Sequence, residues 1–449
     1  MGKLFGTDGI RGEANRYPMD APTAFALGQA ATHVLRKQDH TTRIVIGKDT
    51  RISSYMLESA LESGITSMGG EPWLVGVLPT PGIAFMTESM RADAGLVISA
   101  SHNPFQDNGI KVFSGKGFKL SDEQEEEIEE LMLAGGLPEM VPAASEMGRA
   151  YRLSDAHGRY IVFLKNTFPR SLSLEGMKIA VDTAEGATYR VAPEALAELG
   201  AELTVIHDEP DGLNINRDCG SQHTADLRKT VVETGAAVGL AFDGDGDRLI
   251  AVDEKGTEIT GDQILIICAR QLKEEGELRN DLLVSTIMSN LGLTVACKKY
   301  GFRHHASKVG DRYVLEDMQR LGAIIGGEES GHMIFLDHHT TGDGILTALQ
   351  LLAAMLKTGK PLSELAALMD VFPQKLINVD VKSKPDIATV PEIVAAVAQA
   401  EAELKDQGRV LVRYSGTQNM CRVMVEGPTV ETTEKYCELI AGVVKDAIG

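Results

Sequence analysis

The stretch that decides the fold is Ala94-Gly-Leu-Val-Ile-Ser-Ala-Ser-His-Asn-Pro104. Residues 96–98 form a short continuous apolar run, which is typical of a strand buried on both faces of a parallel sheet, and Asn103-Pro104 indicates a turn after it. Functional side chains of open α/β sheets gather outside the carboxyl ends of strands, so Ser101 is a candidate functional residue. Taken alone, a serine in this place more often closes a strand with a hydrogen bond.

Outward from this stretch, helix-like and strand-like patterns alternate and recur at roughly 100-residue spacing, which indicates a repeated α/β unit. A pattern that begins with a strand at 249–252 forms the third of these units. The last part differs, because its strands at 409–414 and 420–426 favour an antiparallel α+β arrangement. At about 150 residues per domain, the 449 residues predict three or four domains. We expect three α/β domains with mixed sheets at 1–150, 151–252 and 253–368, and an α+β domain at 369–449.

The composition is that of a soluble globular protein, with 43% hydrophobic and 24% charged residues. No apolar run reaches the roughly 18 residues of a membrane span, and the N-terminus lacks a signal-peptide pattern, so we expect a cytoplasmic protein without membrane contact. A net charge of −20 argues against general nucleic-acid binding. Seven acidic residues at 122–130 predict a solvated helix face. The scattered cysteines indicate core thiols and neither a disulfide frame nor a zinc site: Cys219, Cys268, Cys297, Cys421 and Cys437.

Three alternating carboxylates follow the apolar run that ends at residue 242. In extended backbone Asp243, Asp245 and Asp247 point to one side, and such a set of hard oxygen ligands suits Mg²⁺. An EF-hand loop is the competing interpretation, because Glu254 occupies its twelfth position. It fails because Arg248 stands where the calcium loop needs Gly and the flanks have strand patterns. A purely structural acidic turn remains the alternative.

Between the last two predicted strands lies the segment Arg413-Tyr-Ser-Gly-Thr417, a candidate anion site. It offers a guanidinium, the hydroxyls of Ser415 and Thr417, and Gly416, which lets backbone N–H groups face a ligand. Arg422 adds a second positive charge. A Ser-Gly-Thr turn between strands is also a common plain hairpin, and this alternative stays open.

A further polar loop, Glu328-Glu-Ser-Gly-His332, offers acceptors for sugar hydroxyls and two carboxylates for a substrate amine. An acidic surface turn with a structural histidine is the alternative. The phosphate-binding loop of NTPases and the nucleophile elbow of α/β-hydrolases are both missing from the sequence. A serine, a Mg²⁺ triad, a sugar-like loop and a phosphate clamp together indicate phosphoryl transfer through a phosphorylated serine.

With these four loops, the chain resembles the α-D-phosphohexomutase superfamily over essentially its full length. Residues 99–104 match its phosphoserine loop with Ser101 as nucleophile, and 243–248, 327–332 and 413–417 match its metal, sugar and phosphate loops. Segments 6–12 and 307–312 are similar to the branch that acts on glucosamine phosphates. The chain departs from the usual pattern at Ser99, where Thr is more common, and at Gln418-Asn419, where the family usually has Glu-Pro.

The resemblance implies four domains around a central cleft and interconversion of glucosamine 6-phosphate and glucosamine 1-phosphate, which feeds the synthesis of UDP-N-acetylglucosamine and cell-wall precursors. It implies one Mg²⁺ per chain, a sugar 1,6-bisphosphate as intermediate or activator, a phosphorylated amino sugar as the binding partner, and a monomer or homodimer. Relatives that act on glucose or mannose phosphates commonly place Met at position 329, so such a mutase is the first alternative, and a non-catalytic phosphosugar sensor is the second. The implied roles are catalytic for phospho-Ser101, His102, Lys111, Arg11 and Arg248, substrate binding for Glu328, Glu329, Ser330, His332 and Lys308, phosphate binding for Arg413, Ser415, Gly416, Thr417 and Arg422, and metal binding for Ser101, Asp243, Asp245 and Asp247.

Overall fold

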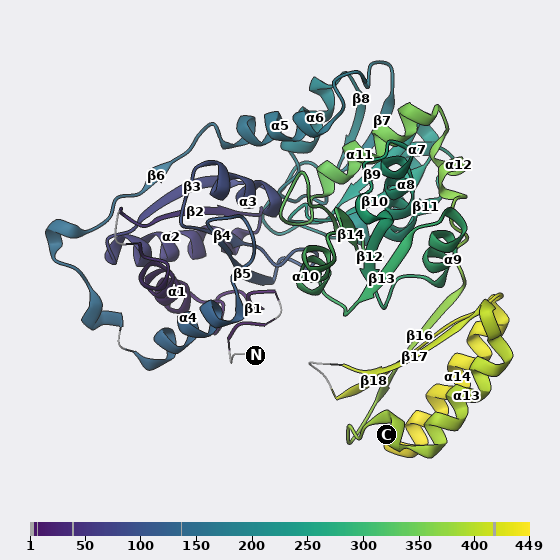
Figure 1. Cartoon of the computed structure of the whole chain (residues 1–449). Coiled ribbons are helices and arrows are strands. Elements are labelled where there is room, and N and C mark those ends of the chain that lie inside the picture. The colour runs from purple at the N-terminus through teal and green to yellow at the C-terminus, as the bar shows by residue number, and fades with distance from the viewer. Residues whose placement is uncertain (1–3, 7, 38–39, 136, 416–418) are drawn as a thin grey trace. The chain divides into compact units, whose positions relative to one another are not determined.

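The computed structural model describes residues 4–6, 8–37, 40–135, 137–415 and 419–449. Its strands form four sheets, three of them mixed and flanked by helices, as predicted for the fold class (Figure 1). The chain divides into two compact units, which are Met1–Ile287 with Arg303–Ala367, and Met288–Phe302 with Leu368–Gly449. Within the described ranges, no helix combines the length and the apolar character that a membrane span requires. All five cysteines are buried and none of them is in a disulfide with another, which confirms the prediction of core thiols.

The first sheet has the strand order β1-β5-β4-β2-β3-β6. Strand β2 is parallel to β3 and β4, whereas β5 is antiparallel to both β4 and β1. Buried leucines and isoleucines of α1, α2 and α4 pack with the sheet in one hydrophobic core. The elements are β1 (Ile10–Glu13), α1 (Ala21–Val34), β2 (Arg43–Lys48), α2 (Ile52–Ser67), β3 (Glu71–Val77), α3 (Thr80–Ser89), β4 (Ala94–Ile98), β5 (Asp107–Ser114), α4 (Asp122–Ala134) and β6 (Tyr151–Arg152).

Helix α4 corrects one prediction, because its acidic residues do not all face solvent. The side chain of Glu129 is buried, and its Oε2 accepts hydrogen bonds from the backbone N–H groups of Leu4 (2.9 Å) and Phe5 (3.1 Å). Glu125 is also buried and pairs with Arg312 at 3.2 Å. Two of the acids therefore hold the start of the chain and helix α10 (Asp311–Leu321), contacts that a local charge pattern does not reveal.

The second sheet has the order β11-β10-β9-β7-β8. Strand β10 is antiparallel to β9, with Leu249 opposite Phe242. The strand at 249–252 therefore completes the second sheet and does not begin the third repeat of the α/β pattern, which corrects that expectation. The expected second domain, 151–252, already included this strand. The elements are α5 (Ala156–Thr167), β7 (Lys178–Asp182), α6 (Val191–Glu198), β8 (Glu202–Ile206), α7 (Ala225–Thr234), β9 (Val238–Phe242), β10 (Leu249–Asp253) and β11 (Glu258–Ile259).

The third sheet has the order β13-β12-β14-β15, with β12 parallel to both of its neighbours. Strand β13, Arg-His-His-Ala-Ser, was not predicted, because it lacks the apolar residues that mark a buried strand. Helix α9 (Leu291–Tyr300) belongs to the second compact unit. The other elements are α8 (Gly261–Glu274), β12 (Leu282–Thr286), β13 (Arg303–Ser307), β14 (Ile325–Gly327), β15 (Met333–Phe335), α11 (Gly344–Thr358) and α12 (Leu362–Ala366).

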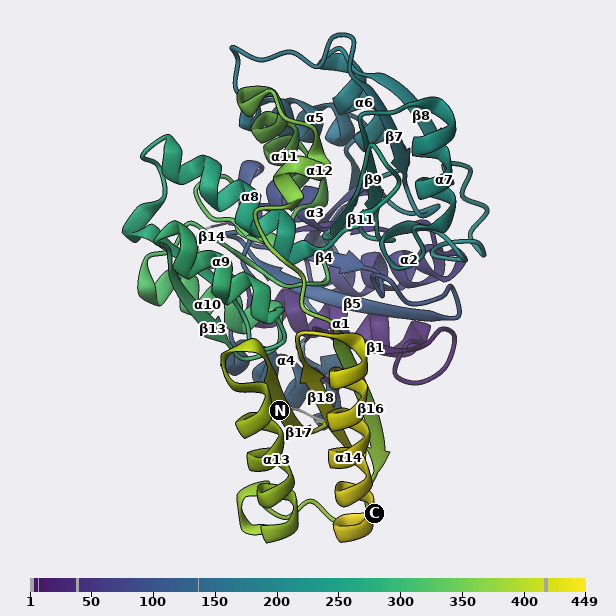
Figure 2. The same cartoon turned by 90° about the vertical axis from the view of Figure 1, so that its right-hand side faces the viewer.

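The second unit contains a three-stranded antiparallel sheet with the order β16-β18-β17, as the sequence predicted. Figure 2 shows α13 and α14 side by side along this sheet, and their apolar residues share one core with it. The elements are β16 (Gln374–Asp380), α13 (Pro391–Leu404), β17 (Arg409–Tyr414), β18 (Met420–Glu426) and α14 (Val430–Ile448).

Candidate active site

Ser101 lies in the turn after β4, whose five residues are all buried. Its φ of 51° is a left-handed conformation, which a serine adopts only where the surroundings hold it. The Ser101 side chain is almost fully buried, and its Oγ donates a hydrogen bond of 2.6 Å to Oδ2 of Asp243. Nδ1 of His102 lies 3.3 Å from the same Oγ. The hydroxyl is therefore presented to a carboxylate of the second sheet and does not close its own strand.

Arg51, which follows β2, holds the turn of Ser101 from behind. Its fully buried guanidinium donates to Oδ2 of Asp49 at 2.8 Å and to four carbonyl oxygens of the turn, those of Ser101 (3.0 Å), Asn103 (2.7 Å), Pro104 and Asp107 (3.1 Å). Every donor nitrogen of the guanidinium is thereby in use. Sequence reasoning missed Arg51, although the carboxyl ends of the neighbouring parallel strands β2 and β4 must meet at one edge of the sheet.

The two serines of the turn have different partners. The Ser99 hydroxyl donates to Oδ2 of Asp49 at 2.6 Å and accepts the backbone N–H of Ser101 at 3.0 Å. Ser99 is thus bound into the support of the turn, and Ser101 alone of the two faces the aspartates. The family more commonly has Thr at position 99, but both contacts use only the hydroxyl group, which Ser99 also supplies.

Asp243, Asp245 and Asp247 follow β9 and are all buried. One carboxylate oxygen from each lies within 4.8 Å of the others. Burial raises the pKa of Asp243 well above its usual value, and the neighbouring carboxylates of Asp247 and Asp245 raise it further. The strands on both sides of the loop exclude an EF-hand. The alternative of a purely structural acidic turn has to account for three carboxylates that are buried together.

The aspartate cluster fits a divalent cation. Oδ1 of Asp245 and Oδ1 of Asp247 are buried and have no hydrogen-bond partner in the part of the chain that the structure describes, although buried polar atoms are normally paired. The other oxygen of Asp245, Oδ2, accepts a hydrogen bond of 2.7 Å from the Thr80 hydroxyl, a partner that the sequence did not predict. Two unpaired oxygens among three clustered carboxylates are the kind of oxygen donor that Mg²⁺ prefers in proteins.

Cations surround the aspartates. Nζ of Lys111 lies 3.1 Å from Oδ2 of Asp245, 3.6 Å from Oδ2 of Asp247 and 3.4 Å from Oδ2 of Asp8. Burial lowers the pKa of Lys111, but these carboxylates outweigh it and raise the pKa above its usual value, so the amine stays charged. The backbone N–H of Arg248 donates to Oδ1 of Asp243 at 3.2 Å.

Asp8 connects this cluster to the predicted Arg11 and to further charged residues that sequence reasoning did not name as site residues. Besides Lys111, it pairs with Arg11 and with Lys119, whose Nζ lies 2.6 Å from Oδ1 of Asp8. Lys119 in turn pairs with Asp311 at 2.7 Å. The match of segments 6–12 and 307–312 to one family branch covered Asp8 and Asp311, but nothing in the sequence pointed to Lys119. The three residues are far apart in the sequence.

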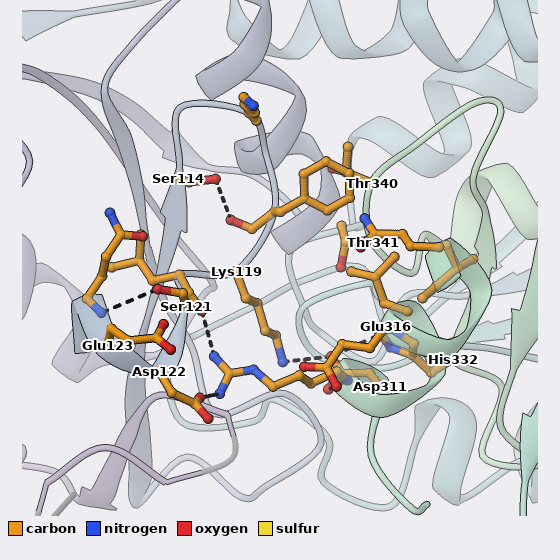
Figure 3. Close-up of a pocket in the computed structure, with 18 residues that line it drawn as sticks. Ser114, Lys119, Ser121, Asp122, Glu123, Asp311, Glu316, His332, Thr340 and Thr341 are labelled. Atoms are coloured by element: carbon orange, nitrogen blue, oxygen red, sulfur yellow. Dashed lines mark hydrogen bonds and ion pairs between the residues drawn. The ribbon is translucent and has the colours of Figure 1, made fainter. Parts of the chain in front are cut away.

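A pocket of about 590 Å³ borders these residues, a size usual for small-molecule sites. Figure 3 shows Lys119 and Asp311 pointing toward each other, with His332 close to Asp311. His332 is the one residue of the predicted sugar loop that lines the pocket among the described residues. Burial lowers the pKa of His332, but Asp247 (3.5 Å) and Asp311 (3.9 Å) outweigh it and raise the pKa to about 9.

The other residues of the predicted sugar site lie in different surroundings. Glu328 is half-buried, and its Oε1 accepts the backbone N–H of Gly310 at 3.0 Å. Glu329 is half-buried, Ser330 is exposed, and Lys308 is exposed with its amine 5.5 Å from the ring centre of Tyr313. The structure thus brings Glu328 and His332 to the charged cluster, and it does not bring Lys308 into it.

The predicted phosphate site lies in the second unit. Arg413 of β17 stands directly opposite Arg422 of β18, an arrangement that is unfavourable without an anion. Burial and the charge of Arg422 lower the pKa of Arg413, and among the described residues neither guanidinium has a carboxylate partner. Nζ of Lys384 donates to the carbonyl oxygen of Ser415 at 3.0 Å. Gly416 and Thr417 lie outside the described residues.

Four models of the phosphoglucomutase/phosphomannomutase family match the chain: α/β/α domain I at residues 2–137, domain II at 158–256, domain III at 260–372 and the C-terminal domain at 376–443. A phosphoglucosamine mutase of Syntrophobacter fumaroxidans is 78% identical over the whole of both chains, and one of Syntrophus aciditrophicus is 64% identical over the same length.

Solved structures with this fold include a phosphoglucomutase/phosphomannomutase family protein of Burkholderia thailandensis, with a TM-score of 0.81, 22% identity and coverage of 99% of this chain and 97% of that one. Another is an N-acetylphosphoglucosamine mutase of Aspergillus fumigatus in complex with GlcNAc-6P and magnesium, with a TM-score of 0.70, 17% identity and coverage of 99% and 96%. At these identities, the likeness concerns the fold.

Proposed function

The chain belongs to the phosphoglucomutase/phosphomannomutase family, and from this premise we propose that it interconverts glucosamine 6-phosphate and glucosamine 1-phosphate. The named activity of relatives that share 78% and 64% of their residues with the whole chain supports this substrate. The reaction is an isomerisation in which a phosphoryl group passes through Ser101.

The observation that carries the proposal is the hydrogen bond of 2.6 Å between Ser101 Oγ and Asp243 Oδ2. It joins a hydroxyl held in a strained turn to a buried cluster of carboxylates and cations. A serine that only ended its strand would have no reason to meet this cluster, which lies 142 residues away in the sequence.

The transfer consists of two matched steps. In the first, the bond between Ser101 Oγ and phosphorus breaks as a bond forms from the free sugar hydroxyl to the same phosphorus, and the hydroxyl proton leaves to a base. The product is glucosamine 1,6-bisphosphate. After this intermediate turns end for end, a bond forms from Ser101 Oγ to the other phosphorus as the bond from that phosphorus to its sugar oxygen breaks. The sugar oxygen takes up the proton that the base received, which regenerates phosphoserine and releases the isomeric monophosphate.

Mg²⁺ would be held by Asp243, Asp245 and Asp247, with a phosphoserine oxygen as a further ligand. When bound, it supplies positive charge against the charge that develops on the phosphoryl oxygens. The chain adds fixed cations around the same place, with Lys111 among the aspartates and Arg248 and Arg11 nearby. Nδ1 of His102 lies 3.3 Å from Ser101 Oγ, and His102 is the candidate base that accepts the proton of the sugar hydroxyl.

The phosphate that is not being transferred would bind to Arg413, Ser415, Gly416, Thr417 and Arg422. The two arginines stand opposite each other, and within the described ranges neither has a carboxylate partner. They support this role because a phosphate accepts hydrogen bonds from both and removes their repulsion. Such binding away from the reacting atoms orients the sugar for transfer.

Recognition of the amino group rests on the sugar loop, where Glu328, Glu329, Ser330 and His332 would face the sugar, with Lys308 nearby. Glu329→Met tests it, because methionine removes the carboxylate at nearly constant length. We expect kcat/KM for glucosamine 6-phosphate to fall while that for glucose 6-phosphate holds or rises. Equal specificity constants of the wild type for glucosamine, glucose and mannose 6-phosphates would instead favour a broader hexose-phosphate mutase.

The central experiment compares Ser101→Ala with Ser99→Ala. We expect Ser101→Ala to carry no phosphate by mass spectrometry and to have no mutase turnover. Ser99→Ala keeps the reactive hydroxyl and loses only its support, so it should be phosphorylated and partly active. Substantial turnover by purified Ser101→Ala would reject Ser101 as the carrier. Phosphorylation of the wild type without turnover in a coupled assay would favour a phosphosugar sensor.

A further inference from the structure

A second cluster of ligating side chains lies at the carboxyl edge of the second sheet and uses none of the residues assigned above. Asp182 ends β7, and His207 directly follows the parallel strand β8, in which Ile206 is the register partner of Asp182. Cys219 returns to the same edge at the end of the following loop. One ligand atom from each of these three residues lies within 4.8 Å of the other two.

The burial of the cluster suits an ion that solvent does not reach easily. Asp182 is fully buried and Cys219 is 2% exposed, whereas the His207 side chain is 24% exposed and provides a route of entry. Each Asp182 oxygen accepts one backbone N–H, from Ala184 for Oδ1 and from Gly220 for Oδ2, both at 2.9 Å. Since a carboxylate has about four acceptor positions, lone pairs remain for a ligand.

Several polar atoms of the cluster lack the partners that buried groups normally have. Nδ1 of His207 is buried and lies 3.1 Å from Oδ2 of Asp182, but among the described residues it has no hydrogen bond of regular geometry. Oε2 of the nearby Glu185 is likewise buried and unpaired. For the Cys219 thiol, the described residues offer no hydrogen-bond partner. An imidazole nitrogen, a carboxylate oxygen and a sulfur are thus available together.

The charges around Cys219 are mainly negative. The carboxylates of Asp182, Glu185 and Asp218 are its charged neighbours, and the guanidinium of Arg217 opposes them. A dication among these groups would offset the carboxylates and stabilise the thiolate, because a coordinated thiol loses its proton.

We propose that Asp182, His207 and Cys219 form a site for a structural zinc-class divalent ion, with Glu185 or a water molecule as the fourth ligand. Sulfur and imidazole ligands select such an ion over Mg²⁺, which prefers oxygen. The spacing of the cysteines in the sequence indicated no zinc site. This site escapes such a test because its three ligands come from separate segments of the chain that meet only at the edge of the folded sheet.

An ion at this site would fix the loop that supports the turn of Ser101. Nδ2 of Asn216, three residues before Cys219, donates to the carbonyl oxygens of Ser101 (2.9 Å) and Asn103 (3.0 Å). Several residues between 207 and 219 have left-handed backbone conformations, among them His207 (φ 55°), Asn216 (φ 58°) and Asp218 (φ 56°). Such conformations persist only where the surroundings hold them, and the ion would contribute to that restraint.

Cobalt titration of the full-length protein tests the site, because only a thiolate ligand gives sulfur-to-cobalt charge-transfer absorption. The protein is stripped of transition metals and kept in excess Mg²⁺, which occupies the aspartate site. We expect one equivalent of Co²⁺ to produce the absorption and one equivalent of Zn²⁺ to abolish it. Cys219→Ser should lack it, whereas Cys268→Ser, a buried thiol outside the cluster, should retain it.

His207→Asn supplies an independent measurement, because its half-buried position tolerates the change. We expect it to weaken Co²⁺ binding at least about tenfold, since loss of even an outer-shell partner of a metal site costs this much. The proposal is overturned if folded wild type shows no sulfur-to-cobalt absorption, or if the absorption survives in Cys219→Ser. Should Cys219→Ser fail to fold by circular dichroism, unchanged affinity in His207→Asn overturns it and weakened affinity supports it.

Discussion

Replacement of Arg51 by methionine should both destabilise the first domain and disorder the turn that carries Ser101. Methionine fills part of the space but removes all five hydrogen bonds of the guanidinium, including the ion pair of 2.8 Å with the fully buried Asp49. Breaking a buried ion pair by removing one partner costs about 3–5 kcal/mol, because the other charge stays buried. Loss of position by about 1 Å at a reacting group lowers turnover about 100-fold.

The stability change can be followed with the single tryptophan, Trp73, which lies in β3 opposite Val45 of β2. Its fluorescence during urea unfolding therefore reports on the sheet that Arg51 supports. We expect the free energy of unfolding of Arg51→Met to fall by about 3–5 kcal/mol. Arg51→Lys should lie between it and the wild type, because lysine keeps the charge beside Asp49 but has three donors in place of five.

The control is Arg190→Met, which removes an arginine whose side chain is 55% exposed. Its ion pair with Glu194 is long, with 3.9 Å between Arg190 Nε and Glu194 Oε1. Such a surface substitution should change the free energy of unfolding by less than about 0.5 kcal/mol. If Arg51→Met behaved like this control, with turnover also unchanged, the guanidinium would not be the support of the turn and the reasoning would be refuted.

Three further changes test other contacts. Thr80→Val removes the hydroxyl that donates to Oδ2 of Asp245 and should lower the free energy of unfolding by about 1.5–3 kcal/mol, measured by urea denaturation; no change would mean that water replaces the hydroxyl. Asp243→Asn should raise the melting temperature of the Mg²⁺-free protein, because it removes one of three carboxylates that repel one another. The same variant should have no turnover when Mg²⁺ is restored, and a lower melting temperature would contradict the repulsion. Burial lowers the pKa of His339 to about 4 from an ordinary 6.5, so the folded state favours neutral imidazole, and its contribution to stability is complete above about pH 6.5 and declines as the pH falls toward 4. The decline is up to about 3 kcal/mol, and His339→Gln should flatten it in urea titrations across this range; an equal slope in both proteins would assign the effect to other groups.

Local patterns predicted most of the helices and the buried strands, and they drew attention to the polar loops that follow the strands. A strand such as β4 is predictable because its run of apolar residues is continuous. The triad of aspartates is predictable because alternate residues of an extended chain face the same side. Strand β13 escaped because its side chains are polar, and β10 was assigned to the wrong sheet because a strand's own sequence does not name its partner.

Local patterns did not predict the contacts between residues that are far apart in the sequence. The acidic run of α4 resembled a solvated surface, yet Glu129 is buried against the backbone of Leu4 and Phe5, more than a hundred residues away in the sequence. Asp8, Lys119 and Asp311 likewise meet only because the first and third sheets are folded into one unit. No periodicity within a segment encodes such meetings.

By itself, the sequence determined that this protein has buried α/β sheets with reactive side chains at the ends of their strands, because burial and loop chemistry are properties of neighbouring residues. Only the tertiary structure decided which of those side chains work together. It placed the Ser101 hydroxyl on Asp243, used every donor of Arg51 behind it, and gathered Asp182, His207 and Cys219 at one edge. The physical reason is that hydrogen bonds and ion pairs act over a few ångströms, and distances in space follow the packing of the sheets, not the order of the chain.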